Sequence, residues 1–161
     1  MRNADVIELF DRVPVYTPVS IVEFAVEDGS WSDLQSAARA VRETVFVQEQ
    51  QVPADLEWDE FDVVCRHAIA RNAEGQAIGT GRLLPDGRIG RMAVLPGWRG
   101  KEVGSALFER LLQAAKFSGM PKIELHAQTH AAGFYAHYGC IAQGREYMEA
   151  GIPHISMTRM L

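Results

Sequence analysis

The chain has 161 residues, of which 47% are hydrophobic, and a formal net charge of −5. This length is enough for one well-buried core and predicts a single domain. The acidic balance gives no electrostatic support to nucleic-acid binding, and no apolar stretch reaches membrane-spanning length. Cys65 and Cys140 lack the spacing of a metal or disulfide pair, so we expect no metal site and a reducing, cytoplasmic setting.

The N-terminal segment, residues 1–18, contains two prolines and predicts an arm that precedes a domain over residues 19–161. Its acidic residues stand where a signal peptide needs an apolar core. The next segment, residues 19–27, has the pattern of a strand.

The first helix is expected to open at a capping box formed by Ser32 and Gln35 and to end near Glu49. The following run QQVPADLEWDEFD predicts an irregular acidic stretch. Glu57 and Asp59 in this run either bind a cationic amine or form a solvated face.

Strands over 63–71, 77–84 and 88–96, with a Pro-Asp-Gly turn before the third, predict an antiparallel meander. A helix over 103–118 ends at Gly119. The remaining predicted elements are a strand over 122–128, a short helix capped by Thr129 that runs to Tyr138, and strands over 140–148 and 154–160.

The strand over 122–128 follows a strand and a crossover helix, so the right-handed connection rule makes it parallel to 88–95. The expected fold is therefore a mixed α/β domain. Its sheet is mostly antiparallel with one central parallel pair, and helices cover both faces.

The loop before the second long helix predicts an anion site. Arg99, Gly100 and Lys101 directly precede Val103, so backbone N–H groups and the positive helix end point to one place. The alternative is a solvated connection, since no Walker motif is present. Five cations within twenty residues suit an anionic small molecule; they are Arg82, Arg88, Arg91, Arg99 and Lys101.

The motifs RMAVLP, RGKEVG followed by SALFERLL, KIELHAQ and AAGFYAHYGC together resemble the GNAT superfamily of acyl-CoA N-acyltransferases. VFVQEQQVPADLEWD, ELHAQ and AGIPH further resemble its YjcF-like bacterial branch. The resemblance implies acetyl-CoA as acetyl donor, with its pantetheine arm between the two parallel strands where they splay. The cofactor-binding residues it implies are Met92, Ala93, Val94, Arg99, Gly100, Lys101, Glu102, Val103, Gly104, Ser105 and Phe134.

Glu102 departs from the family loop, which has glycine at this position. A carboxylate near pyrophosphate adds repulsion of about 1 kcal/mol if it is solvated. Alternatively, the side chain points to water while the N–H faces the phosphate, and a glutamate in the first helical turn favours the helix dipole.

Acetyl transfer needs a neutral amine, a group that polarises the oxyanion and a proton donor for the departing thiolate. The resemblance implies Tyr135 as the general acid; the alternative is an aromatic core residue. Glu124, His126 and Gln128 alternate onto one face of their predicted strand. His126 is the candidate base, with a buried core histidine as the alternative.

Glu49, Glu124 and Gln128 are the expected contacts of the acceptor, a small-molecule amine. Cys140 is expected to be a buried thiol rather than a nucleophile. The expected function is N-acetyl transfer through a ternary complex. The competing interpretations are a non-catalytic acyl-CoA sensor, which Glu102 favours, and a nucleotide-binding regulator, which rests on the loop alone. A homo-oligomer is compatible with the sequence, which does not specify one.

Overall fold

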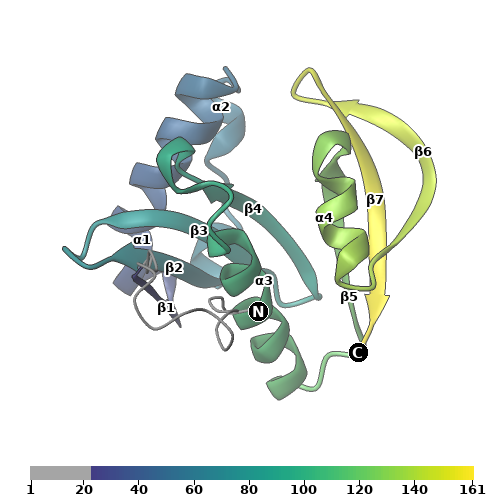
Figure 1. Ribbon diagram of the computed structural model, residues 1–161. Helices are drawn as coiled ribbons and strands as arrows, with labels where there is room; N and C mark the ends of the chain where they lie inside the picture. The colour runs from purple at the N-terminus through teal and green to yellow at the C-terminus, as the bar shows by residue number, and fades with distance from the viewer. Residues whose placement is uncertain (1–22) are drawn as a thin grey trace, which may run out of the picture.

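The computed structural model describes residues 23–161, so the predicted arm and the start of the first strand lie outside the described residues. The strands are β1 (Phe24–Gly29), β2 (Arg66–Asn72), β3 (Ala77–Leu83), β4 (Arg88–Val94), β5 (Lys122–Gln128), β6 (Ile141–Glu149) and β7 (Ile152–Met160). They form one sheet in the order β1-β2-β3-β4-β5-β7-β6 (Figure 1). Only β4 and β5 are parallel, which confirms the predicted mixed sheet.

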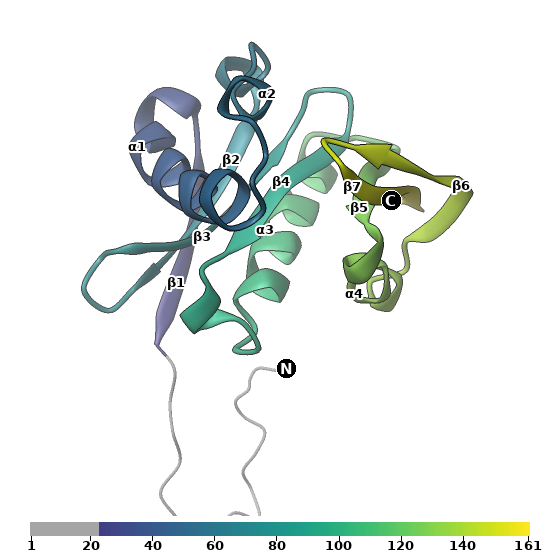
Figure 2. The ribbon, with the colours of Figure 1, turned by 90° about the horizontal axis from the view of Figure 1, so that it is seen from above.

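The helical elements are α1 (Trp31–Arg42), η1 (Glu43–Glu49), α2 (Ala54–Glu57), η2 (Asp62–Val64), η3 (Pro96–Trp98), α3 (Val103–Phe117), η4 (Thr129–Ala131) and α4 (Ala132–His137). α1 and α3 lie on opposite faces of β1–β4 (Figure 2). The alternation of β2 explains this, because Ile69 packs with α1 while Ala68 and Ala70 pack with α3. Within residues 23–161, no helix is long and apolar enough to cross a membrane.

The first helix begins two residues earlier than predicted. Ser30 is its N-cap, and its hydroxyl accepts a hydrogen bond from the Asp33 N–H at 3.3 Å. The predicted capping box of Ser32 and Gln35 is therefore wrong. The helix passes into the π-helical turn η1 and ends at Glu49, as the pattern predicted.

The last helix, in contrast, is shorter than predicted. Thr129 opens the 3₁₀ turn η4 and does not cap α4, whose N-cap is Ala131 with no side-chain hydrogen bond. Its end is as expected, because Gly139 adopts φ +84°, the left-handed conformation that suits glycine after a helix.

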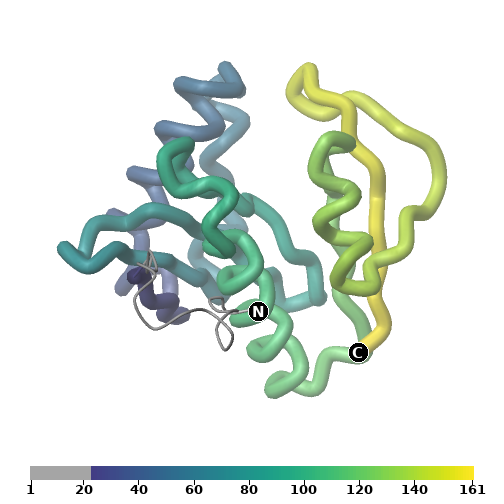
Figure 3. Tube along the Cα trace, viewed as in Figure 1, coloured from purple at the N-terminus to yellow at the C-terminus, as the bar shows by residue number. Residues whose placement is uncertain are grey.

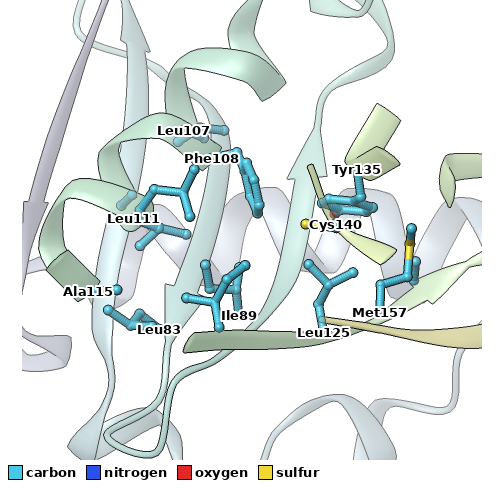
Figure 4. Packing of buried hydrophobic residues seen from close by; sticks show 14 of the residues in the cluster. Leu83, Ile89, Leu107, Phe108, Leu111, Ala115, Leu125, Tyr135, Cys140 and Met157 are labelled. Atoms are coloured by element: carbon cyan, nitrogen blue, oxygen red, sulfur yellow. The ribbon is translucent and has the colours of Figure 1, made fainter. Parts of the chain in front are cut away.

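A large apolar cluster joins the two halves of the sheet. Phe108 of α3 packs edge-to-face against Tyr135 of α4, with ring centroids 5.3 Å apart. Leu125 of β5 and Met157 of β7 lie in the same cluster (Figure 4). The core thus holds β5, β6 and β7 to the rest of the fold from the α3 face. On the opposite face, Ile152 of β7 packs against a second, smaller apolar cluster that includes Val45 and Phe46.

Candidate functional site

β4 and β5 run parallel but are paired at only two positions, Arg88 with Glu124 and Ile89 with Leu125. Beyond these positions the two strands diverge toward their carboxyl ends (Figures 1 and 3). β4 stays paired with β3 on its other side as far as Val94. The side of β4 that faces β5 is therefore left without a strand partner.

A β-bulge lies where this unpaired edge of β4 begins. The register between β3 and β4 shifts so that Gly81 stands opposite both Arg91 and Met92. Arg91 has φ +52°, a left-handed conformation disfavoured for a residue with a Cβ. A Cβ on Gly81 would collide with Met92 Sδ, so a larger residue beneath the bulge would require the Met92 side chain to move. Strained backbone is concentrated at functional sites, and no local sequence pattern indicated it.

Backbone groups of β4 point toward the open side. Leu95 N donates to a β3 carbonyl at 2.9 Å, so by alternation the backbone of Val94 faces away from β3. The Met92 carbonyl shares that direction, whereas Ala93 faces β3. The Val94 carbonyl accepts a hydrogen bond from Arg99 Nε at 2.9 Å. The Met92 carbonyl and the Val94 N–H thus remain for a ligand.

The predicted phosphate loop lies between η3 and α3. Gly100 and Glu102 have φ +76° and +69°, so both are left-handed. Glu102 directly precedes Val103, the first residue of α3; its side chain is exposed and makes no capping hydrogen bond. A glutamate therefore adopts the conformation for which glycine is the ordinary choice, with its carboxylate in solvent.

Other predicted cofactor-binding residues meet behind this loop. A Cβ on Gly104 would lie 3.8 Å from the Phe134 ring and 3.9 Å from Val94 Cγ2. Ser105 is half-buried in the first turn of the same helix. The fold thus brings together residues that lie up to forty positions apart at the carboxyl end of β4.

Arg99 and Glu49, which were assigned to two different ligands, form a bidentate ion pair. Arg99 Nη1 and Nη2 donate to Glu49 Oε2 and Oε1 at 2.8 and 2.7 Å. The hydrogen bond from Arg99 lowers the pKa of Glu49. Glu49 is thus paired with a cation here, and its role as a contact of the acceptor stays a prediction.

The predicted basic island is largely neutralised, which corrects the expectation of an anion-attracting patch. Arg82 and Arg91 are bound by carboxylates of the acidic segment, and Arg88 pairs with Asp86 at 3.0 Å. We define the arginine–carboxylate cluster as Arg42, Arg82, Arg91, Glu57, Asp59 and Asp62.

Glu57 and Asp59 are consequently paired with arginines rather than part of a solvated face, whereas Asp55 and Glu60 of the same segment are exposed. Glu57 is 3% exposed and bonded to Arg42 at 2.7 Å. Burial raises the pKa of Glu57, although Arg91 and Arg42 oppose the rise. Burial would also raise the pKa of Asp59, but Arg82 and Arg91 lower it to about 2.

Glu124, His126 and Gln128 share one face of β5, as predicted, while the alternate residues are buried in the core. The His126 side chain is 40% exposed, and its Nδ1 lies 3.5 Å from Glu149 Oε1. The interpretation of His126 as a buried core histidine is therefore wrong. Gln128 exchanges two hydrogen bonds with Gln50, at 3.1 and 2.9 Å, which bridge β5 to the end of η1.

Tyr147 of β6 completes this polar face and was missed from the sequence. Its ring lies edge-to-face with His126, with centroids 5.8 Å apart, and stacks against His154 at 6.0 Å. Its hydroxyl is buried without a hydrogen-bond partner among residues 23–161. Alternation along β6 would have been the signal, but a bulge between Gln143 and Tyr147 interrupts it.

Tyr135 lies beneath the aromatic residues of α3 and α4. It packs against Phe108 and Phe134 and points toward Cys140 (Figure 4). In the part of the chain that the structure describes, its hydroxyl has no hydrogen-bond partner. Burial raises the pKa of Tyr135 above its ordinary value, so the phenol stays neutral. Cys140 is buried as expected, and burial raises the pKa of its thiol, which disfavours a nucleophilic thiolate.

The chain matches the model of the acetyltransferase (GNAT) domain over residues 36–161. It is 37% identical to the uncharacterized N-acetyltransferase YjcF of Bacillus subtilis (strain 168), covering 74% of this chain and 87% of the relative.

Among solved structures, it is similar to an acyl-CoA N-acyltransferase from Pseudomonas aeruginosa, with TM-score 0.76 and 34% identity over 85% of this chain and 99% of that one. It is also similar to Escherichia coli ElaA, with TM-score 0.75 and 30% identity over 84% of this chain and 99% of that one.

Proposed function

The chain belongs to the GNAT acetyltransferase family, and from that premise we propose that it transfers an acetyl group from acetyl-CoA to a primary amine of a small molecule. The observation that carries the proposal is the divergence of β4 from β5. It leaves an extended, unpaired backbone edge that begins at a bulge and ends at an anion-binding loop.

The dimensions of this edge suit the cofactor. The pyrophosphate would lie at the N–H groups between Gly100 and Ser105, where the dipole of α3 favours negative charge. The pantetheine amides would pair with the Met92 carbonyl and the Val94 N–H. From Leu95 back to Gly90 is about 16 Å of strand at roughly 3.3 Å per residue. The thioester would then lie at the bulge, where β4 meets β5.

Tyr135 is the proposed acid for the departing thiolate. Burial keeps its phenol protonated at neutral pH, so a donor hydrogen is always present. The same raised pKa makes it a weak acid, so it acts first as a hydrogen-bond donor and transfers the proton as the carbon–sulfur bond breaks.

The acceptor would approach from the polar face of β5 and β6. Glu124 and Glu149 supply negative charge there, and Gln128 and Tyr147 supply hydrogen-bonding groups. A protonated amine is attracted to such a face and must lose one proton before attack. His126 is half-exposed at this position and is the proposed base, acting directly or through water. The arrangement favours a small cationic amine.

The cellular setting that we propose is the cytoplasm. Cys65 and Cys140 are both buried free thiols, which is the usual state of cysteine in a reducing compartment.

Two measurements test the proposed function. Calorimetry should show binding of coenzyme A and acetyl-CoA with a rise in melting temperature, and much weaker effects of ATP and NAD. Thiol release from acetyl-CoA should then depend on one or more amines of a panel that spans neutral, cationic and polyamine acceptors. No heat and no thermal shift with millimolar coenzyme A would remove the cofactor assignment. Binding without acetylation of any amine would favour the acyl-CoA sensor.

A further inference from the structure

The arginine–carboxylate cluster carries three positive and three negative side chains beneath the α1 side of the sheet. Arg42 and Asp62 are 1% and 3% exposed, and their closest approach is 2.8 Å. Buried ion pairs are often no more stabilising than apolar residues of the same volume. Stability alone therefore does not explain why six charged groups are gathered here.

The cluster is built around the bulge in β4. Arg91, the residue with positive φ, directs its guanidinium to Glu57 Oε2 at 3.1 Å and to Asp59 Oδ2 at 3.3 Å. The same group donates to the backbone carbonyls of Glu57, at 3.0 Å, and Leu56, at 3.3 Å. Four acceptors from one segment thus hold the side chain of the strained residue.

A second arginine holds the facing strand to the same segment. Arg82 of β3 lies next to Gly81, the residue opposite the bulge, and binds Asp59 through two bonds of 2.8 and 2.9 Å. Asp59 therefore bridges the two strands whose register shifts. Arg82 Nε is left buried without a partner within residues 23–161, which marks the cluster as an arrangement not optimised for stability alone.

We propose that the arginine–carboxylate cluster positions the bulge of β4 so that one of its backbone N–H groups meets the carbonyl of the acyl thioester. This inference rests on the proposed function, because it requires acyl-CoA in the divergence of β4 and β5. The charged side chains of the cluster touch neither cofactor nor acceptor. They act by fixing the backbone at Arg91, whose φ would otherwise relax to the favoured region.

The test compares coenzyme A with a ketone isostere of acetyl-CoA in which a methylene replaces the sulfur. The isostere keeps the carbonyl and cannot transfer its acetyl group, so no acceptor is needed. Calorimetry on the wild type should give about five- to tenfold tighter binding of the isostere, the effect of about one hydrogen bond. In Asp59→Asn the preference should fall to less than twofold, while coenzyme A itself binds within threefold of wild type.

Glu27→Gln is the matched control, because it removes a carboxylate from an exposed arginine pair, Arg71–Glu27, and should keep the preference. Arg91→Ala is the second variant, in case Asp59→Asn does not fold. Alanine keeps the Cβ that disfavours the positive φ and removes the anchor, so the preference should again be lost. Thermal unfolding of each variant accounts for changes in stability.

The results separate this inference from the proposed function. If the folded variants keep a preference for the isostere within twofold of the wild-type preference, the positioning role is wrong. It is also wrong if the wild type binds both compounds equally. If the wild type binds neither, the cofactor assignment itself fails, and the inference fails with it.

Discussion

Replacing Glu102 by glycine should stabilise the protein. Glu102 has φ +69°, and this left-handed conformation costs a residue with a Cβ about 1–2 kcal/mol of conformational free energy. Glycine avoids that cost but has about 0.5–1 kcal/mol more unfolded-state entropy to lose. The expected net gain is about 0.5–1 kcal/mol, or a rise of about 1–4 °C in melting temperature for a chain of this length.

Gly100→Ala is the matched control in the same loop. Gly100 has φ +76°, and a Cβ there would meet no atom within 4 Å, so the substitution tests backbone strain alone. It should lower the melting temperature, opposite in sign to Glu102→Gly. Differential scanning calorimetry of both variants measures the two shifts. A lower melting temperature for Glu102→Gly would refute the reasoning from strain.

The same variant tests whether Glu102 weakens cofactor binding. Its side chain is exposed, so the repulsion that it adds to pyrophosphate is screened and is about 1 kcal/mol at most. Glu102→Gly should therefore change the Kd of coenzyme A by less than about fivefold. If Glu102→Gly binds coenzyme A tenfold or more tightly than the wild type, Glu102 weakens cofactor binding, which would strengthen the sensor interpretation.

The remaining predictions concern the catalytic groups, the loop and acid stability. Tyr135→Phe should preserve coenzyme A binding and thermal stability while lowering turnover on a working amine by about 10² to 10⁴; wild-type turnover in this variant would exclude the acid. His126→Ala should slow the reaction mainly at low pH, where more amine arrives protonated, and a uniform loss across pH would argue against a base. Lys101→Ala should weaken coenzyme A binding without altering the melting temperature, whereas Arg99→Ala should weaken binding and also lower the melting temperature. Equal melting temperatures of the two variants would contradict this. Asp59, with its pKa lowered to about 2, is expected to contribute about 1–2 kcal/mol that is present above pH 4 and lost as pH falls toward 2; denaturant midpoints of wild type and Asp59→Asn should therefore converge in acid.

The elements were predictable because their signals are local. The alternation in β5 gave its bounds, and the apolar spacing of α3 with Gly119 after it gave that helix. Parallel pairing of β4 and β5 followed from a connection rule rather than from side-chain detail. Capping was less predictable, because Ser30 and Ser32 are both good N-cap residues and only the tertiary position of α1 selects between them.

The site was predictable where it follows strand direction and was not where it depends on ion pairing. Glu124, His126 and Gln128 share a face because a strand alternates. The carboxylate partners of Arg82 and Arg91 lie twenty or more residues away along the chain, so the sequence alone indicated a free basic patch. Only the folded structure shows that the acidic segment packs against Arg82 and Arg91.

The distribution of charge after folding decides how the loop can bind an anion. Arg82 is held by the buried Asp62 and Arg91 by the buried Glu57, and withdrawing either arginine would leave an unpaired buried charge, which costs several kcal/mol. Arg99 is different, because its pair with Glu49 is about 40% exposed and such pairs contribute about 0–1 kcal/mol. A pyrophosphate can therefore recruit Arg99 at small cost, and Lys101 has no acidic partner within residues 23–161. Among residues 23–161, the backbone N–H groups at the start of α3 and these two side chains are therefore the anion site that we propose, and substitutions at positions 99 and 101 should separate charge from stability.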